Sequence, residues 1–134
     1  MKLAQNLTGS LLYTVDGKAP TLSEDKTTFI VSLGTTPLPE NMSEKEAAMN
    51  RLNKLPYTNL SVDETASGEV IVDGMKGYEI VAYGPLKDGM VSGVVYQMML
   101  FNAQGYCLLI GTSTTELKEN ISLFKKVAKT FKRK

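Results

Sequence analysis

An α+β fold is predicted for this chain: an antiparallel sheet of four to six strands packed by two helices. Short β-prone segments separated by turn signals run from residue 69 to residue 110, which is typical of an antiparallel meander. Two segments with helical spacing and recognisable starts lie near 43–54 and 114–131, and they supply the helices. The length of 134 residues fits a single domain over 1–134.

Two strands are expected before the first helix. Residues 11–15 form a short β-prone segment, and residues 27–33 are rich in β-branched and aromatic side chains. Residues 20–25 are polar and typical of a loop. We expect residues 1–26 to be peripheral and partly mobile.

The first helix is expected near 43–54. Ser43 and Glu46 match the S-x-x-E capping box, in which each side chain satisfies an N–H group exposed at the helix start. Pro56 cannot continue a helix and biases the residue before it away from helical geometry. The apolar stripe of this helix consists of Ala48, Leu52 and Leu55.

Four strands joined by short connections are expected next, at 69–72, 78–83, 91–101 and 106–110. The connections carry turn signals at Asp73-Gly74 with Gly77, from Gly84-Pro85 to Asp88-Gly89, and from Asn102 to Gly105. The strand at 91–101 is apolar on both faces, which predicts a central strand covered on both sides. One face carries Val94, Tyr96, Met98 and Leu100, and the other carries Val95, Gln97, Met99 and Phe101.

The second helix, over 114–131, is the most clearly patterned element. Ser113 and Glu116 repeat the capping pattern. Its apolar stripe suits a helix packed on a sheet, and it consists of Leu117, Ile121, Phe124, Val127, Ala128 and Phe131.

Composition excludes most catalytic chemistries. Without His there is no Ser-His-Asp or Cys-His nucleophile and no His-based zinc site, and one Cys makes neither a thiolate zinc site nor an internal disulfide. Asp73-Gly74-x-x-Gly77 lacks the residues of a phosphate-binding loop. We expect no catalytic residue, no metal and no cofactor, and hence no enzyme.

Membrane and export signals are not evident in the sequence. No apolar run approaches the roughly 18 residues that span a bilayer, and residues 1–8 have no apolar signal-peptide core. We expect no transmembrane segment. The compartment stays open between the cytoplasm and an exported form whose leader is not in this sequence.

Charge is segregated along the chain. Residues 1–124 carry 9 basic and 14 acidic side chains, whereas residues 125–134 carry six basic ones and no acidic one. Cations are favoured near a helix C-terminus, so helix termination is one explanation; an anionic partner or membrane surface is another. Nucleic acid is not expected, because no recognised motif is present. The candidate anionic-partner patch comprises Lys125, Lys126, Lys129, Lys132, Arg133 and Lys134.

Two polar residues interrupt otherwise apolar strands. Glu79 and Gln97 either mark a ligand or partner surface, or they face solvent at an edge or satisfy neighbouring backbone groups. The candidate surface would also include the tyrosines Tyr78, Tyr83 and Tyr96.

The C-terminal half, read through residues 73–80, 95–101, 105–112 and 120–132, resembles the PsbP/Mog1/DcrB-like superfamily. That resemblance implies an antiparallel sheet between helices, closed by a helix docked on it. It also implies a domain that binds or assists other proteins, as extrinsic photosystem proteins, a Ran-binding nuclear factor, periplasmic lipoproteins and chaperones of secreted effectors do.

We therefore expect a non-catalytic binding or accessory domain of an extracytoplasmic, for example periplasmic, bacterial protein. Its partner would be another protein. The alternative is a chaperone-like or assembly factor that binds another protein through an exposed sheet face or edge, in an arrangement compatible with a homodimer.

Overall fold

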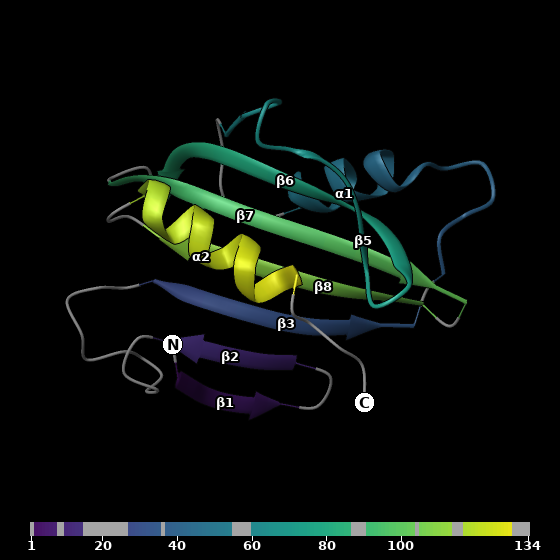
Figure 1. The fold of residues 1–134 in the computed structure, drawn as a ribbon, viewed down its shortest axis with the longest axis horizontal. Coiled ribbons are helices and arrows are strands. Elements are labelled where there is room, and N and C mark those ends of the chain that lie inside the picture. Colours follow the sequence, from purple (N-terminus) through teal and green to yellow (C-terminus); the bar gives the residue numbers. More distant parts are fainter. Residues whose placement is uncertain are drawn as a thin grey trace.

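The computed structural model describes residues 2–7, 10–14, 27–35, 37–54, 60–86, 91–103, 105–113 and 117–129. It confirms the α+β class: one antiparallel sheet lies between two helices (Figure 1). The strands are β1 (Lys2–Leu7), β2 (Ser10–Thr14), β3 (Thr28–Gly34), β4 (Ser61–Val62), β5 (Gly68–Val72), β6 (Met75–Leu86), β7 (Val91–Asn102) and β8 (Gly105–Ser113). The helices are α1 (Glu44–Leu52) and α2 (Leu117–Lys129).

The strand order is β1-β2-β3-β8-β7-β6-β4, and β5 also pairs with β6. The expected meander is confirmed, because β5, β6, β7 and β8 pair in succession and antiparallel. All six segments expected as strands are strands, and β1 and β4 are additional.

Turn chemistry sets the start of the meander. Asp73 and Gly74 have φ of 52° and 75°, and they connect the paired residues Val72 and Met75. Two consecutive residues with positive φ suit the tight right-handed twist of a hairpin. The expected connection at Gly84-Pro85 is wrong at its start, because β6 continues to Leu86 and Pro85 pairs with Ser92.

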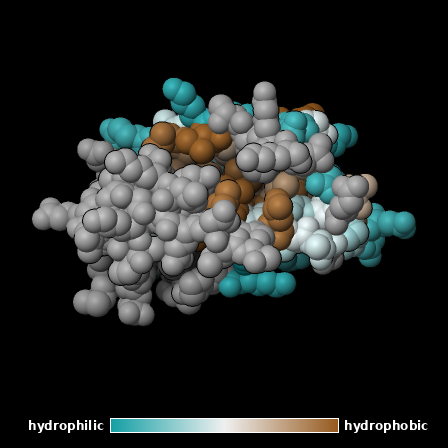
Figure 2. Space-filling model, turned by 90° about the horizontal axis from the view of Figure 1, so that it is seen from below, coloured by the Kyte–Doolittle hydropathy of each residue, from teal (hydrophilic) through white to brown (hydrophobic). Residues whose placement is uncertain are grey.

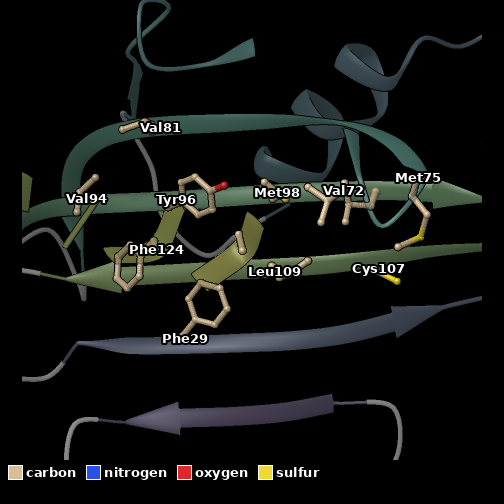
Figure 3. Packing of buried hydrophobic residues seen from close by; sticks show 12 residues of the cluster. Phe29, Val72, Met75, Val81, Val94, Tyr96, Met98, Cys107, Leu109 and Phe124 are labelled. Atoms are coloured by element: carbon tan, nitrogen blue, oxygen red, sulfur yellow. The ribbon is translucent and has the colours of Figure 1, made fainter. Parts of the chain in front are cut away.

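β7 is the central strand that its two apolar faces predict. It lies between β6 and β8, and all its residues from Val94 to Leu100 are buried. On one face, residues of β6, β7 and β8 pack with Phe29, Phe124 and Ala128 (Figure 3). β5 lies on this side too and adds Val72. On the other face, the sheet packs with Ala48 and Leu52 of α1.

α1 begins at the predicted cap, with one half of the predicted capping box: the Glu46 carboxylate lies 3.4 Å from the Ser43 hydroxyl and not on the Ser43 backbone N–H. Ser43 is the N-cap, and its hydroxyl accepts a hydrogen bond from the Glu46 N–H at 3.1 Å. Acidic residues in the first turn, Glu44 and Glu46, suit the positive end of the helix dipole.

β1 and β2 extend the sheet past β3 and form its outer edge (Figure 1). Residues 15–26 lie outside the described part of the chain, so the expected mobility there stays a prediction.

Candidate functional site

A buried polar network joins β6, β7 and α2. Tyr96 donates its hydroxyl proton to Glu79 Oε2 at 2.7 Å. Lys125 Nζ lies 3.3 Å from the other carboxylate oxygen of Glu79 and donates to the Ala66 carbonyl at 2.7 Å. Both carboxylate oxygens therefore have partners inside the protein.

The network is largely withdrawn from solvent. The Glu79 side chain is 9% exposed and that of Lys125 is 26% exposed. Burial raises the pKa of Tyr96 well above its usual range, and the negative charge of Glu79 and their hydrogen bond raise it further. Tyr96 thus stays protonated as a donor. This arrangement clamps α2 to the sheet.

The turn that receives Lys125 has its own internal hydrogen bonds. Asp63 accepts from the Thr65 hydroxyl at 2.7 Å and from the Thr65 N–H at 3.1 Å. These bonds hold the pKa of the exposed Asp63 carboxyl below its usual range. The turn positions the Ala66 carbonyl for Lys125.

Gln97 lies on the opposite face of β7, under α1. Its amide nitrogen donates to the Ala48 carbonyl at 2.8 Å, and its side chain is fully buried. Its Oε1 atom is buried without a hydrogen-bond partner. Burying an oxygen without a hydrogen-bond partner lowers the free energy of unfolding by about 1–3 kcal/mol. Packing alone therefore does not explain a glutamine at position 97.

The expected surface of Glu79, Gln97 and three tyrosines does not exist as one site. Successive strand residues point to opposite faces of a sheet. Glu79 and Tyr96 meet on the α2 side, and Tyr83 packs there as well. Tyr78 lies on the α1 side, with Lys45 Nζ 5.9 Å from its ring centre. Glu79, Gln97, Tyr78 and Tyr96 are buried.

The basic C-terminal segment is also divided. Lys125 points inward to Glu79, so it does not belong to a solvated anionic-partner patch. Lys126 and Lys129 are exposed and lie in the last turn of α2, where the helix dipole favours them. Lys132, Arg133 and Lys134 lie outside the described residues.

A second buried polar cluster orients α2, and nothing in the sequence pattern indicated it. Asn120 Nδ2 donates to Ser113 Oγ at 2.8 Å and lies 3.4 Å from Thr27 Oγ1. Ser113 Oγ and Thr27 Oγ1 are 2.9 Å apart. Glu116, the expected capping partner of Ser113, lies outside the described residues. The flank of α2 that carries Asn120 therefore faces the start of β3.

Hydrophobic side chains are exposed on this same flank. Leu123 and Val127 follow Asn120 by three and seven positions, so they lie on one side of the helix. They are 38% and 41% exposed. The expected burial of Val127 is wrong, because the inward line of α2 runs through Phe124 and Ala128, which are fully buried.

β3 presents further apolar side chains on the α2 side. Its Phe29 ring centre lies 5.7 Å from that of Phe124, so alternation along the strand places Val31 and Leu33 on this face. Leu33 is 61% exposed, and Val31 is partly buried. Figure 2 views the molecule from the β1 side and shows several areas of hydrophobic surface, coloured brown, beside atoms drawn in grey. We call the four residues Val31, Leu33, Leu123 and Val127 the α2–β3 patch.

Two further findings concern the described ranges only. They contain no group of three or more His, Cys, Asp and Glu side chains that could hold a metal ion. No helix within them is both long and apolar enough to cross a membrane.

Comparison with known proteins identifies the fold and no family. No protein-family model matches the chain, and neither does any curated protein. A crystal structure of PA94 from Pseudomonas aeruginosa, a protein of unknown function described as a candidate regulator, matches with a TM-score of 0.67 at 11% identity. The match covers 98% of this chain and 87% of that one. At this identity the likeness shows that the two chains share a fold.

Proposed function

We propose that this chain is a non-catalytic binding or accessory domain that takes an apolar segment of another protein on the α2–β3 patch. One observation carries the proposal. Among the described residues, four large hydrophobic side chains are exposed, and three of them, Leu33, Leu123 and Val127, belong to this patch. Clustered exposed hydrophobics are typical of interaction sites, whereas isolated ones are common on any surface.

The polar groups support a binding role over a catalytic one. The Glu79 carboxylate is engaged inside the protein by Tyr96 and Lys125, where it holds α2 to the sheet. Lys126 and Lys129 are exposed on α2. A partner with acidic residues beside its apolar segment would be complementary to this helix.

A chaperone-like or assembly factor is the alternative within the same mode of binding. The exposed apolar surface suits a factor that shields a partner's hydrophobic segment before that partner assembles. Membership of the PsbP/Mog1/DcrB-like superfamily and an extracytoplasmic bacterial location remain predictions from the sequence resemblance.

Site-specific photo-crosslinking in cells that make this protein tests the proposal. A benzophenone amino acid replaces Val127 in one variant and Ile71 in a control. Ile71 is 70% exposed but belongs to β5 and not to the patch. We expect a discrete adduct with another protein from position 127 and none from position 71.

A second substitution makes the result specific. Leu33→Glu, introduced into the position-127 variant, should abolish the adduct because it places a charge in the apolar patch. Equal adducts from positions 71 and 127 would contradict the proposal. An adduct with twice the mass of the chain would identify the partner as a second copy of this chain and not as a different protein.

A further inference from the structure

The apolar side chains of α2 do not by themselves decide which way the helix faces. Phe124 points inward and is fully buried. Ile121 and Val127 lie three positions before and after it, which places them about 60° to either side of Phe124 around the helix. Ile121 packs against the buried core, whereas Val127 is 41% exposed. Apolar packing would also suit a helix rolled about its axis so that Val127 took the inner position.

The apolar side chains even favour that rolled position. Leu123 lies on the same side of α2 as Val127 and is 38% exposed. A roll that turned this side down onto the sheet would exchange Ile121 and Ala128 for Val127 and Leu123, which are the larger pair. Burial of apolar surface is favourable and not directional. Hydrophobic burial therefore does not explain why these two side chains stay outside.

Polar side chains on the two flanks of α2 hold it in the observed position. Lys125 Nζ reaches the Glu79 carboxylate at 3.3 Å and the Ala66 carbonyl at 2.7 Å. On the other flank, Asn120 reaches Ser113 Oγ at 2.8 Å. A roll would draw Lys125 away from Glu79 and press the Asn120 amide between the helix and the sheet. Both changes leave buried polar groups without partners, which is unfavourable, so these contacts select one roll.

We propose that Glu79, Lys125 and Asn120 are positioning residues for the α2–β3 patch. They fix the roll of α2 that keeps Val127 and Leu123 exposed, and they thereby control partner binding without lying in the patch. The control of binding rests on the proposed function, whereas the control of the roll does not. These buried polar groups thus specify one arrangement of the helix among several with similar apolar burial.

Thiol reactivity at two positions of α2 measures the roll without any partner. Val127→Cys and Ile121→Cys are made separately after Cys107→Ala removes the native thiol, and their reaction with a soluble disulfide reagent is followed in native buffer. Glu79→Gln combined with Asn120→Ala then removes both flank contacts. Glutamine is uncharged and has one acceptor oxygen where glutamate has two, and alanine has no polar side chain.

We expect the Val127→Cys rate to fall about threefold or more when both contacts are removed, and the Ile121→Cys rate to rise, because the roll covers one thiol and uncovers the other. A general loss of stability would raise both rates, so a fall at position 127 is specific to a roll. Ile110→Val, on the α1 face of the sheet, is the control and should lower neither rate.

An unchanged or higher Val127→Cys rate would overturn the proposal. Glu79→Gln alone keeps the Asn120 contact and should lower the Val127→Cys rate in the same direction by a smaller factor. This single variant decides the question if the double variant does not fold, and an unchanged rate in it would then overturn the proposal.

Photo-crosslinking from position 127 tests the consequence for binding. The yield of the adduct should fall about fivefold or more when both flank contacts are removed, because the patch loses its central side chains, whereas Ile110→Val should leave it unchanged. A slower Val127→Cys reaction with an undiminished adduct would overturn the control of binding by the roll. Absence of an adduct from the chain with both contacts intact would instead refute the proposed function, and the thiol rates would still decide the roll.

Discussion

Phe124→Ala should be among the most damaging single substitutions in α2. The Phe124 side chain is fully buried, and its ring centre lies 5.7 Å from that of Phe29 and 6.3 Å from that of Tyr96. A Phe→Ala substitution in a protein core lowers the free energy of unfolding by about 3–5 kcal/mol. Part of that loss comes from the two aromatic pairs, each of which contributes about 0.5–1.5 kcal/mol beyond the burial of its apolar area. We expect a loss of about 4 kcal/mol, which is a large part of the 5–15 kcal/mol typical of a folded domain.

Urea unfolding followed by circular dichroism measures this loss. With a slope of about 2 kcal/mol per molar urea, the midpoint should fall by roughly 2 M while the slope is unchanged. Leu123→Ala is the matched control, because Leu123 neighbours Phe124 on α2 but is 38% exposed, and it should cost less than about 1 kcal/mol. A Phe124→Ala loss no larger than that of Leu123→Ala would refute the core assignment.

Three further substitutions test other parts of the structure. Lys125→Met should lower the free energy of unfolding by about 1–3 kcal/mol at neutral pH, because it leaves the Glu79 carboxylate buried without its cation. This loss should be smaller when Glu79 is also replaced by Gln, and an equal loss in both cases would contradict the pairing of Lys125 with Glu79. Tyr96→Phe should reduce the alkaline loss of stability. The pKa of Tyr96 is raised in the folded state, so its hydroxyl stabilises the fold fully below the unfolded tyrosine pKa near 10 and progressively less as the pH rises above it. If the free energies of unfolding of Tyr96→Phe and of the unaltered chain depended identically on pH from 8 to 11, this role of Tyr96 would be wrong. Gly111→Ala places a Cβ 2.7 Å from the Phe124 ring and should cost about 1–3 kcal/mol by overpacking, measured as a fall in melting temperature; an unchanged melting temperature would show that the ring can yield.

Local patterns account for most of what the sequence could predict. Two apolar faces made β7 recognisable as a central strand, and Asp73-Gly74 marked the hairpin between β5 and β6. Ser43 marked the start of α1. Each of these features depends on residues that are close in sequence, where spacing and backbone preference are decisive.

The candidate site depends on contacts that spacing does not contain. Glu79 and Lys125 are 46 residues apart, and Thr27 and Asn120 are 93 apart. Helical periodicity predicted that Val127 is buried, because Val127 belongs to the apolar stripe of the helix. The stripe is wider than the part of the helix that contacts the sheet, and the sequence pattern cannot show which edge of the stripe stays exposed. Only the position of α2, set by Asn120 on one flank and Lys125 on the other, leaves Val127 and Leu123 exposed.

The measurement that tests the central claim most directly is calorimetric binding of this chain to the partner segment that crosslinking from position 127 identifies. Burial of apolar surface should give a negative heat-capacity change. Val127→Glu should weaken the affinity by tenfold or more, about 1.4 kcal/mol, whereas Ile71→Glu should leave it unchanged. Equal affinities for the unaltered chain and Val127→Glu would contradict binding through the α2–β3 patch.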